Sequence, residues 1–236
     1  MATPRAVIFD WAGTLTPWHE VDARAGWAAF ARGYGTLACA LNNLTAALVD
    51  ADEAAQRVAQ QQNRATTLEA ILRAAGVPPD SVAAEAGLAA YWEFWEPHTI
   101  THPAAGPVLA SLSAADVRIG VLANSIWPRA YHQGLFERDG VAEFLDAQGY
   151  SAEIGVTKPH PEAFRAVLAE LGVSPAEAAY VGDRPYEDIA GAASLGLRTV
   201  LLKHRWFLGD AVRPGDAVPT AIVHDLDEVA ALVLGW

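Results

Sequence analysis

Four polar groups follow apolar segments of this 236-residue sequence, and their residue types could do chemistry. In chain order they are Asp10, Asn124 with Ser125, Lys158, and Asp183 with Asp188. Asp10 ends the apolar run Val7-Ile8-Phe9, and a carboxylate in that place can attack phosphorus or carbon, or bind a metal ion. Taken alone, Asp10 is equally well explained as a cap after an ordinary strand. The four groups in this order favour a reactive site.

The two later carboxylates indicate a metal site if they lie beside Asp10. Asp10, Asp183 and Asp188 would offer an oxygen-rich set of ligands of the kind that Mg²⁺ takes. Lys158 brings a compact positive charge, which a carboxylate nucleophile and a phosphate group both need. A surface lysine is the ordinary alternative, but the chain has only two lysines against 14 arginines. We therefore expect Mg²⁺ as the cofactor.

These residues can meet only if the segments before them are strands of one sheet. Apolar runs typical of buried strands occur at 7–9, 117–122, 179–182, 198–202 and 220–223, and helical segments separate the later ones. Strands that alternate with helices give a parallel sheet, and ligands bind at the carboxyl ends of its strands. The sequence thus predicts an α/β fold, a doubly wound parallel sheet of the Rossmann-like kind.

The segment from 17 to 100 lacks strand patterns and has helical periodicity instead. Leu68, Ile71 and Leu72 follow the three-and-four spacing of an amphipathic helix, and Gly76 is placed to end it. We expect residues 17–100 to form an inserted helical cap domain, and residues 1–16 with 101–236 to form the core domain. The aromatic residues of the insert are expected mainly in its interior, with one or two lining a substrate cleft.

Composition restricts the class of partner. Hydrophobic residues make up 52% and charged residues 19%, which favours a packed core over disorder. The net charge of −12 argues against nucleic acid or an anionic membrane as a partner, and no apolar run reaches the ~18 residues that span a bilayer. Cys39 is the only cysteine, so no intramolecular disulfide can form. No signal peptide precedes the first strand, and we expect a cytoplasmic monomer or homodimer.

The motifs resemble those of the haloacid dehalogenase-like (HAD) superfamily of hydrolases over the whole chain. The similar segments are 10–14 for the first motif, 121–125 for the second, 158–161 for the third and 182–192 for the fourth. The resemblance implies a cap of the C1 kind and an Asp10 that attacks the substrate to form an aspartyl intermediate. It also implies Mg²⁺ held by Asp10, Asp183, Asp188 and the backbone carbonyl of Ala12, with Lys158 steadying the nucleophile and the phosphoryl oxygens.

Two positions depart from the family pattern. Family phosphatases carry a second Asp at the position of Ala12 as general acid and base, and losing such a group typically costs ~10²–10⁴ in rate. The candidates to replace it are His19, Glu20 and Asp22, which follow the first motif closely. His19 is preferred because an imidazole titrates near neutral pH, although an exposed loop histidine is the simpler interpretation. The family usually has Ser or Thr in place of Ala123, and Asn124 or Ser125 would have to hold the phosphoryl group. The candidate substrate contacts are Gly13, Thr14, Trp18 and Arg129.

Three functions remain open. Mg²⁺-dependent hydrolysis of a small phosphorylated metabolite ranks first. A non-phosphate hydrolase comes second: the first motif is similar to that of phosphonoacetaldehyde hydrolases, but these use a cap lysine and residues 1–157 contain none. Haloacid dehalogenases also lack the second Asp, but they usually lose the paired carboxylates that Asp183 and Asp188 retain here. The third is a ligand-binding protein without turnover, suggested by Ala12 and Ala123.

Overall fold

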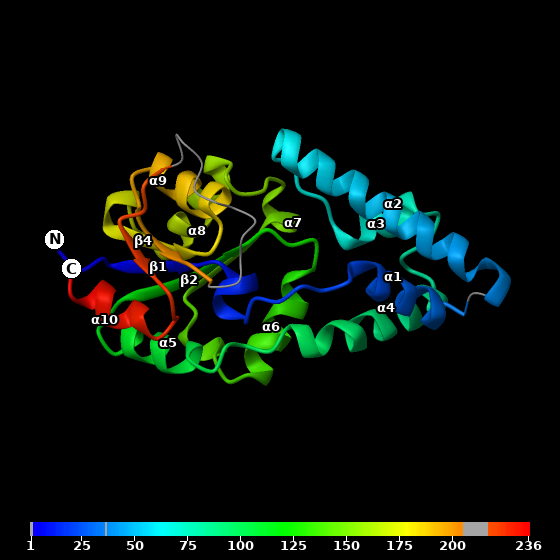
Figure 1. Ribbon diagram of the computed structural model, residues 1–236, viewed down its shortest axis with the longest axis horizontal. Helices are drawn as coiled ribbons and strands as arrows, with labels where there is room; N and C mark the ends of the chain where they lie inside the picture. Colours follow the sequence, from blue (N-terminus) through cyan, green and yellow to red (C-terminus); the bar gives the residue numbers. More distant parts are fainter. Residues whose placement is uncertain (1, 36, 205–216) are drawn as a thin grey trace.

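Six parallel strands form the centre of the computed structural model, which describes residues 2–35, 37–204 and 217–236. The strand order is β3-β2-β1-β4-β5-β6, and every neighbouring pair is parallel. The bounds are β1 Ala6–Phe9, β2 Arg118–Ala123, β3 Ala147–Tyr150, β4 Ala178–Gly182, β5 Arg198–Leu202 and β6 Ala221–Val223. The predicted α/β fold with a doubly wound parallel sheet is confirmed (Figure 1).

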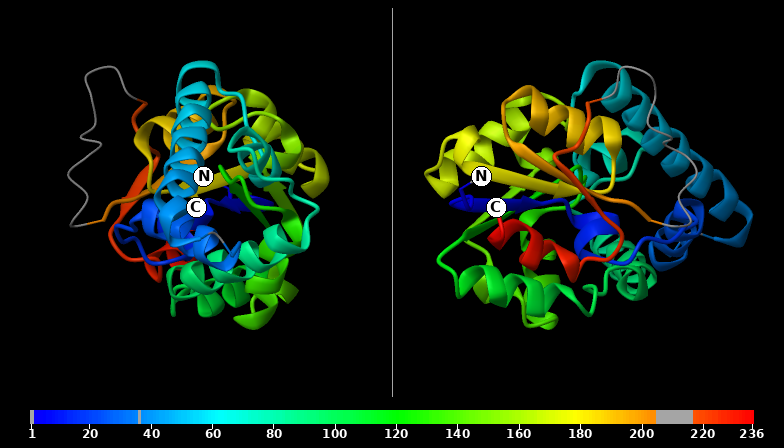
Figure 2. Two further views of the ribbon diagram at one scale, coloured as in Figure 1. Left: turned by 90° about the vertical axis from the view of Figure 1, so that its right-hand side faces the viewer. Right: turned by 60° about the vertical axis from the view of Figure 1, so that its left-hand side comes forward.

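Both faces of the sheet are covered because side chains along each strand alternate between them. Val7 and Phe9 of β1 belong to the apolar cluster that also contains side chains of α5 (Ala105–Ser113), α6 (Arg129–Arg138) and α10 (Glu228–Leu234). Ile8 belongs to the opposite cluster, with side chains of α8 (Pro161–Leu171) and α9 (Gly191–Ser194). Figure 2 shows these two layers on either side of the strands.

Four of the helices that lie between β1 and β2 in the chain gather beyond one end of the sheet (Figure 1). They are α1 (Ala23–Gly33), α2 (Ala38–Gln62), α3 (Leu68–Ala74) and α4 (Val82–Trp95). Helix α1 packs against α2 and α4. Its contact with α4 is close, because a Cβ at Gly33 would lie 2.6 Å from the carbonyl oxygen of Ala86. These helices fall within residues 17–100, and the division into a helical cap domain and a core domain stays a prediction.

Two helices are preceded by ordered turns. The helical turn η5 (Pro185–Ala190) leads directly into α9. Before α10, which begins at Glu228, the Glu228 carboxylate accepts hydrogen bonds from the backbone N–H groups of His224 and Asp225. The short helices are η2 Glu96–His98, η3 Ala142–Phe144, α7 Ser151–Ile154 and η4 Pro175–Glu177. Among the described residues, no helix combines the length and apolarity needed to cross a membrane.

Candidate active site

The predicted reactive residues meet at the carboxyl edge of the sheet. Phe9, the last residue of β1, pairs with Val121 on β2 and with Val181 on β4. Asp10 therefore emerges between the ends of these two strands, and its N–H donates to the Val181 carbonyl at 2.8 Å. Asp183 follows directly after β4. The central position of β1 in the sheet places Asp10 where neighbouring strands can supply partners from both sides.

Lys158 is the buried centre of a network of short polar contacts. Its Nζ lies 2.5 Å from Asp10 Oδ1, 2.7 Å from Asp188 Oδ1 and 2.9 Å from the Tyr180 hydroxyl. Burial alone would lower the pKa of Lys158, but the carboxylates of Asp10 and Asp188 outweigh it and raise this pKa well above its ordinary value. The lysine thus keeps its charge although it is only 3% exposed.

Asp183 is the unsatisfied member of the carboxylate cluster. Both of its carboxylate oxygens are buried, and within the described part of the chain neither accepts a hydrogen bond. Oxygen atoms of Asp10, Asp183 and Asp188 all lie within 4.8 Å of one another. Burial, reinforced by the charges of Asp10 and Asp188, raises the pKa of Asp183 to about 8. A buried carboxylate without a partner is costly, and a hard divalent cation such as Mg²⁺ fits this all-oxygen set.

A sharp turn brings the backbone after Asp10 against these carboxylates. In this turn (η1, Trp11–Leu15) Gly13 has a φ of 86°, and a Cβ there would lie 2.7 Å from Asp183 Oδ2. Only glycine fits both the conformation and the space. Nε2 of His204 donates to the Gly13 carbonyl at 2.5 Å, and the Gly13 N–H donates to Thr16 Oγ1 at 3.2 Å. Ala12, in the same turn, is exposed.

Asn124 and Ser125 lie at the end of β2, as predicted, and both are engaged by other protein groups. Asn124 Oδ1 accepts from the Lys158 N–H at 2.7 Å, and Asn124 Nδ2 donates to the Lys158 carbonyl at 3.1 Å. These two bonds hold the backbone of the lysine in place. Ser125 Oγ lies 2.8 Å from His132 Nε2 and accepts from the Trp127 N–H. The contacts made by Asn124 and Ser125 therefore position their neighbours.

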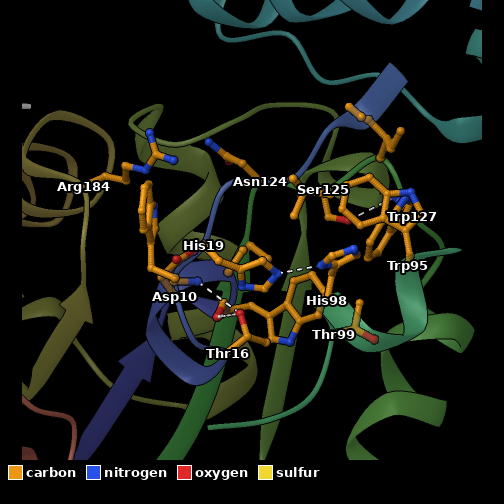
Figure 3. A pocket seen from close by; sticks show the side chains of 18 of the residues that line it. Asp10, Thr16, His19, Trp95, His98, Thr99, Asn124, Ser125, Trp127 and Arg184 are labelled. Atoms are coloured by element: carbon orange, nitrogen blue, oxygen red, sulfur yellow. Dashed lines mark hydrogen bonds between the residues drawn. The ribbon is translucent and has the colours of Figure 1, made fainter. Parts of the chain in front are cut away.

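A cavity of about 480 Å³ opens above Asp10 (Figure 3). One side, here called the core wall, comes from residues 10–13, 16, 123–127, 158, 184 and 187. The other, the cap wall, comes from residues 17–99. The cap wall consists of Pro17, Trp18, His19, Val21, Ala23, Asp52, Gln56, Tyr91, Trp95, His98 and Thr99. Of the predicted residues, His19 and Trp18 therefore face the same cavity as Asp10.

Two histidines of the cap wall are joined by a hydrogen bond (Figure 3). His19 Nε2 lies 2.7 Å from His98 Nδ1, and His19 Nδ1 lies 3.1 Å from the Pro17 carbonyl. Because a carbonyl only accepts, His19 Nδ1 carries a proton, and Nε2 of a neutral His19 accepts from His98 Nδ1. Burial, with a smaller contribution from His19, lowers the pKa of His98. The other three ring nitrogens of the pair are hydrogen-bonded, and among the described residues Nε2 of His98 has no hydrogen-bond partner.

Two predicted substrate contacts do not reach the cavity. The Arg129 guanidinium donates to Glu153 Oε2 at 2.8 Å and to the Gln148 carbonyl at 2.6 Å, and Arg129 is absent from the residues that line the cavity. Its neighbours on β3 and α7 hold it elsewhere. The Thr14 side chain is 1% exposed and packs inside the η1 turn. Gly13 and Trp18 do line the cavity.

Sequence reasoning missed several residues of the site. Tyr180 of β4 hydrogen-bonds both Lys158 and Asp188. The apolar pattern of the strand did not distinguish this tyrosine from its neighbours. His98 and Trp95 lie where α4 gives way to η2, and nothing in their spacing links them to Asp10. Arg184 and Glu187, which flank the predicted carboxylates, also line the cavity.

Known proteins agree with this architecture. A family model described as haloacid dehalogenase-like hydrolase matches residues 4–196. A glyceraldehyde 3-phosphate phosphatase of Methanopyrus kandleri is 30% identical over 157 residues, 66% of each chain. The chain thus spans just under two thirds of that relative. A phosphoglycolate phosphatase of Rhodospirillum rubrum is 30% identical over 212 residues, 85% of this chain and 80% of that protein.

A solved 2-haloacid dehalogenase from Pseudomonas syringae pv. Tomato DC3000 has the same fold. Its TM-score is 0.65 at 24% identity, covering 100% of this chain and 99% of the other. The family match covers all four motif segments, from the strand before Asp10 to the turn after Asp188. This chain therefore belongs to the haloacid dehalogenase-like hydrolases.

Proposed function

We propose that this protein is a Mg²⁺-dependent hydrolase of a small phosphate monoester that works through an ester of Asp10. The observation that carries the proposal is Asp10 held by Lys158 beside the buried, unsatisfied carboxylate of Asp183. The relatives named as phosphatases of glyceraldehyde 3-phosphate and phosphoglycolate support a phosphate ester as substrate. The expected monomer or homodimer and the cytoplasmic location stay predictions.

Asp10 is the nucleophile in this mechanism. Lys158 binds Asp10 Oδ1, and the other carboxylate oxygen attacks phosphorus while the bond from phosphorus to the leaving alcohol breaks. Water then attacks the phosphorus of the aspartyl phosphate, which releases phosphate and restores the Asp10 carboxylate. Asp10, Asp183, Asp188 and the Ala12 carbonyl would hold Mg²⁺, which neutralises charge on the phosphoryl oxygens when bound. Asn124 keeps Lys158 in position for both steps.

The acid and base that Ala12 cannot supply would come from the cap wall. His19 and His98 line the cavity together with Asp10 and share a hydrogen bond. A proton taken up at Nε2 of His98 can be passed on as the Nδ1 proton moves to Nε2 of His19, while the Nδ1–H of His19 stays on the Pro17 carbonyl. We assign the pair, and not His19 alone, the tasks of protonating the leaving alcohol and activating the water. Residues 17–100 would then act as a cap that also carries catalytic groups.

The same site weighs against the two other functions left open. A metal-free dehalogenase would have no use for the buried Asp183 carboxylate, whose desolvation costs stability unless a cation is bound. A protein that only binds ligands would not need the Lys158 contact to Asp10, which aligns the nucleophile at 2.5 Å. Metal-assisted phosphoryl transfer uses both features.

The test is phosphate release from a panel of phosphate monoesters with Mg²⁺ and after chelation. We expect release only with Mg²⁺. Asp183→Asn should abolish the Mg²⁺-dependent release and weaken Mg²⁺ binding in calorimetry. The matched control Asp80→Asn changes a fully solvated carboxylate and should behave as the parent protein. Halide release from a 2-haloacid without metal, or no phosphate release from any ester, would overturn the proposal.

A further inference from the structure

The cap wall of the cavity is aromatic and carries no positive charge among its described residues. Its large aromatic residues are Trp18, Tyr91 and Trp95. Trp127 and Trp11 continue the aromatic surface on the core wall, with Trp95 and Trp127 in edge contact at 5.2 Å between ring centres. Rings packed edge to face leave no gap between them, so together they present an apolar surface and not an open cage.

The positive charges of the cavity all belong to the core wall. Among the described lining residues these are Lys158 and Arg184. Lys158 contacts Asp10 and Asp188, and Arg184 Nε lies 3.9 Å from Asp183 Oδ2. Both cations thus surround the carboxylates where a phosphoryl group would bind. The described residues of the cap wall, toward which the rest of a substrate would extend, include no lysine or arginine.

Apart from the histidine pair, the charged group among the described residues of the cap wall is the Asp52 carboxylate on α2. Its Oδ2 accepts from Trp27 Nε1 at 2.9 Å and its Oδ1 from Gln56 Nε2 at 3.2 Å, so its orientation is fixed. Asp52 also lines an adjoining cavity of about 560 Å³, whose α2 side is completed by Ala55, Gln56, Ala59 and Gln60. A negatively charged group in either space would face this carboxylate in partly desolvated surroundings, which is unfavourable.

We propose, on the basis of the phosphatase function above, that the alcohol released by this enzyme is uncharged and presents an apolar face, as an aryl or alkyl alcohol does. Aromatic walls bind such groups by burying apolar area. An alcohol that carries a carboxylate, as in phosphoglycolate, would meet apolar rings and the Asp52 carboxylate instead of a cation. This chain would therefore differ from its phosphoglycolate phosphatase relative in substrate choice while sharing its fold.

Binding to a variant without the nucleophile tests the proposal apart from turnover. Full-length Asp10→Asn protein with Mg²⁺ is titrated calorimetrically with phenyl phosphate, phosphoglycolate, glucose 6-phosphate and inorganic phosphate. We expect phenyl phosphate to bind roughly tenfold more tightly than phosphoglycolate, a difference that one like-charge contact accounts for. Phosphoglycolate or glucose 6-phosphate binding as tightly as phenyl phosphate would overturn the inference. Binding of none of the four ligands would instead remove the proposed phosphatase function, and this inference with it.

Two charge-matched variants of α2 separate the role of Asp52 from a general change of charge. Asp52→Asn keeps an acceptor for Trp27 and should raise the affinity for phosphoglycolate several-fold, with phenyl phosphate unchanged. Asp50→Asn removes the same charge from an exposed position of α2 that lines neither cavity. It should change neither affinity. Equal effects of the two variants would contradict a specific role for Asp52. Trp95→Ala, with folding checked by circular dichroism, should weaken phenyl phosphate binding and leave inorganic phosphate binding unchanged.

Discussion

The two walls of the cavity differ in composition and in how firmly their side chains are held. The core wall places Asp10 and Lys158 in contacts of 2.5–2.9 Å, with both side chains almost fully buried. The cap wall offers aromatic rings and a histidine pair, and His19 is exposed. The core wall can thus align a nucleophile permanently, whereas the cap wall can adapt to the group that leaves.

This division has a physical origin in the elements that carry the residues. The core residues follow strands that neighbours clamp on both sides, and their register fixes their positions to within a residue. The cap residues come from a loop, a helix end and one long helix that meet only in three dimensions. If the division is correct, core-wall substitutions should remove activity, and cap-wall substitutions should lower it or redirect it.

The largest effect is expected from Asp10→Asn. An amide cannot attack phosphorus, and loss of a nucleophile in a comparable covalent mechanism costs about 10⁶ in kcat. We therefore expect phosphate release from the variant at the background rate, measured with purified protein and the best ester of the panel. Asp116→Asn is the control, because it makes the same change at an exposed residue whose positive φ of 58° asparagine tolerates. Activity of Asp10→Asn within tenfold of the parent would place the nucleophile elsewhere.

An intermediate effect is expected from His98→Ala. Removing one ring of the pair interrupts the transfer of a proton to the leaving alcohol, and we expect kcat to fall about 10²-fold with little change in KM. Imidazole added to the buffer should restore part of the lost rate, which loss of a purely structural side chain would not permit. His224→Ala, which removes an exposed histidine after β6, should have no effect.

The kcat of His98→Ala also decides which of the two walls supplies the acid and the base. If His98→Ala leaves kcat unchanged, the acid and base do not come from the cap wall. The proton would then have to move through core-wall groups or through water alone. The cap wall would then only select the substrate, and the roles proposed for the core-wall residues would not change.

The core wall could largely be predicted from the sequence because Asp10 and Asp183 directly follow apolar strands, and Asp188 lies in the helical turn after Asp183. A parallel sheet leaves one edge where such residues can meet. Lys158 follows no strand directly, and the scarcity of lysine and its motif pointed to it. Residue type then suggested what they do. No knowledge of side-chain packing was needed to bring these four together.

The cap wall could not be predicted in the same way. Trp95 and His98 belong to a helix end whose distance from Asp10 depends on how α1 and α4 pack. Arg129 was predicted to bind substrate because it lies near a motif. Its guanidinium instead donates hydrogen bonds to Glu153 on α7. Sequence patterns locate residues along a chain, and contacts between segments far apart in the chain decide which of them face a cavity.

The smallest effect should come from the other histidine of the site region, and it concerns stability. His132 is fully buried, lies 2.8 Å from Ser125 Oγ and stacks on Tyr150 at 4.2 Å between ring centres. Burial lowers the pKa of His132 to about 3, whereas an unfolded chain has a histidine pKa of about 6.5. The unfolded state therefore binds more protons between these two pH values. The stabilising contribution is complete above pH 6.5 and is lost progressively as the pH falls toward 3.

His132→Phe keeps a ring on Tyr150 and removes this titration. Between pH 7.5 and pH 5 the parent protein should lose about 2 kcal/mol more of its unfolding free energy than the variant does, measured by urea titration at each pH. His224→Ala should show the same pH dependence as the parent. If His132→Phe instead abolished turnover at pH 7.5 while remaining folded, His132 would act in catalysis through Ser125, and proton transfer would belong to the core wall. Parallel stability curves for parent and variant would mean that the buried ring is protonated in the folded protein. The expected result means that His132 is protonated only when the protein unfolds. Its task is therefore structural and differs from the proton transfer proposed for the His19–His98 pair.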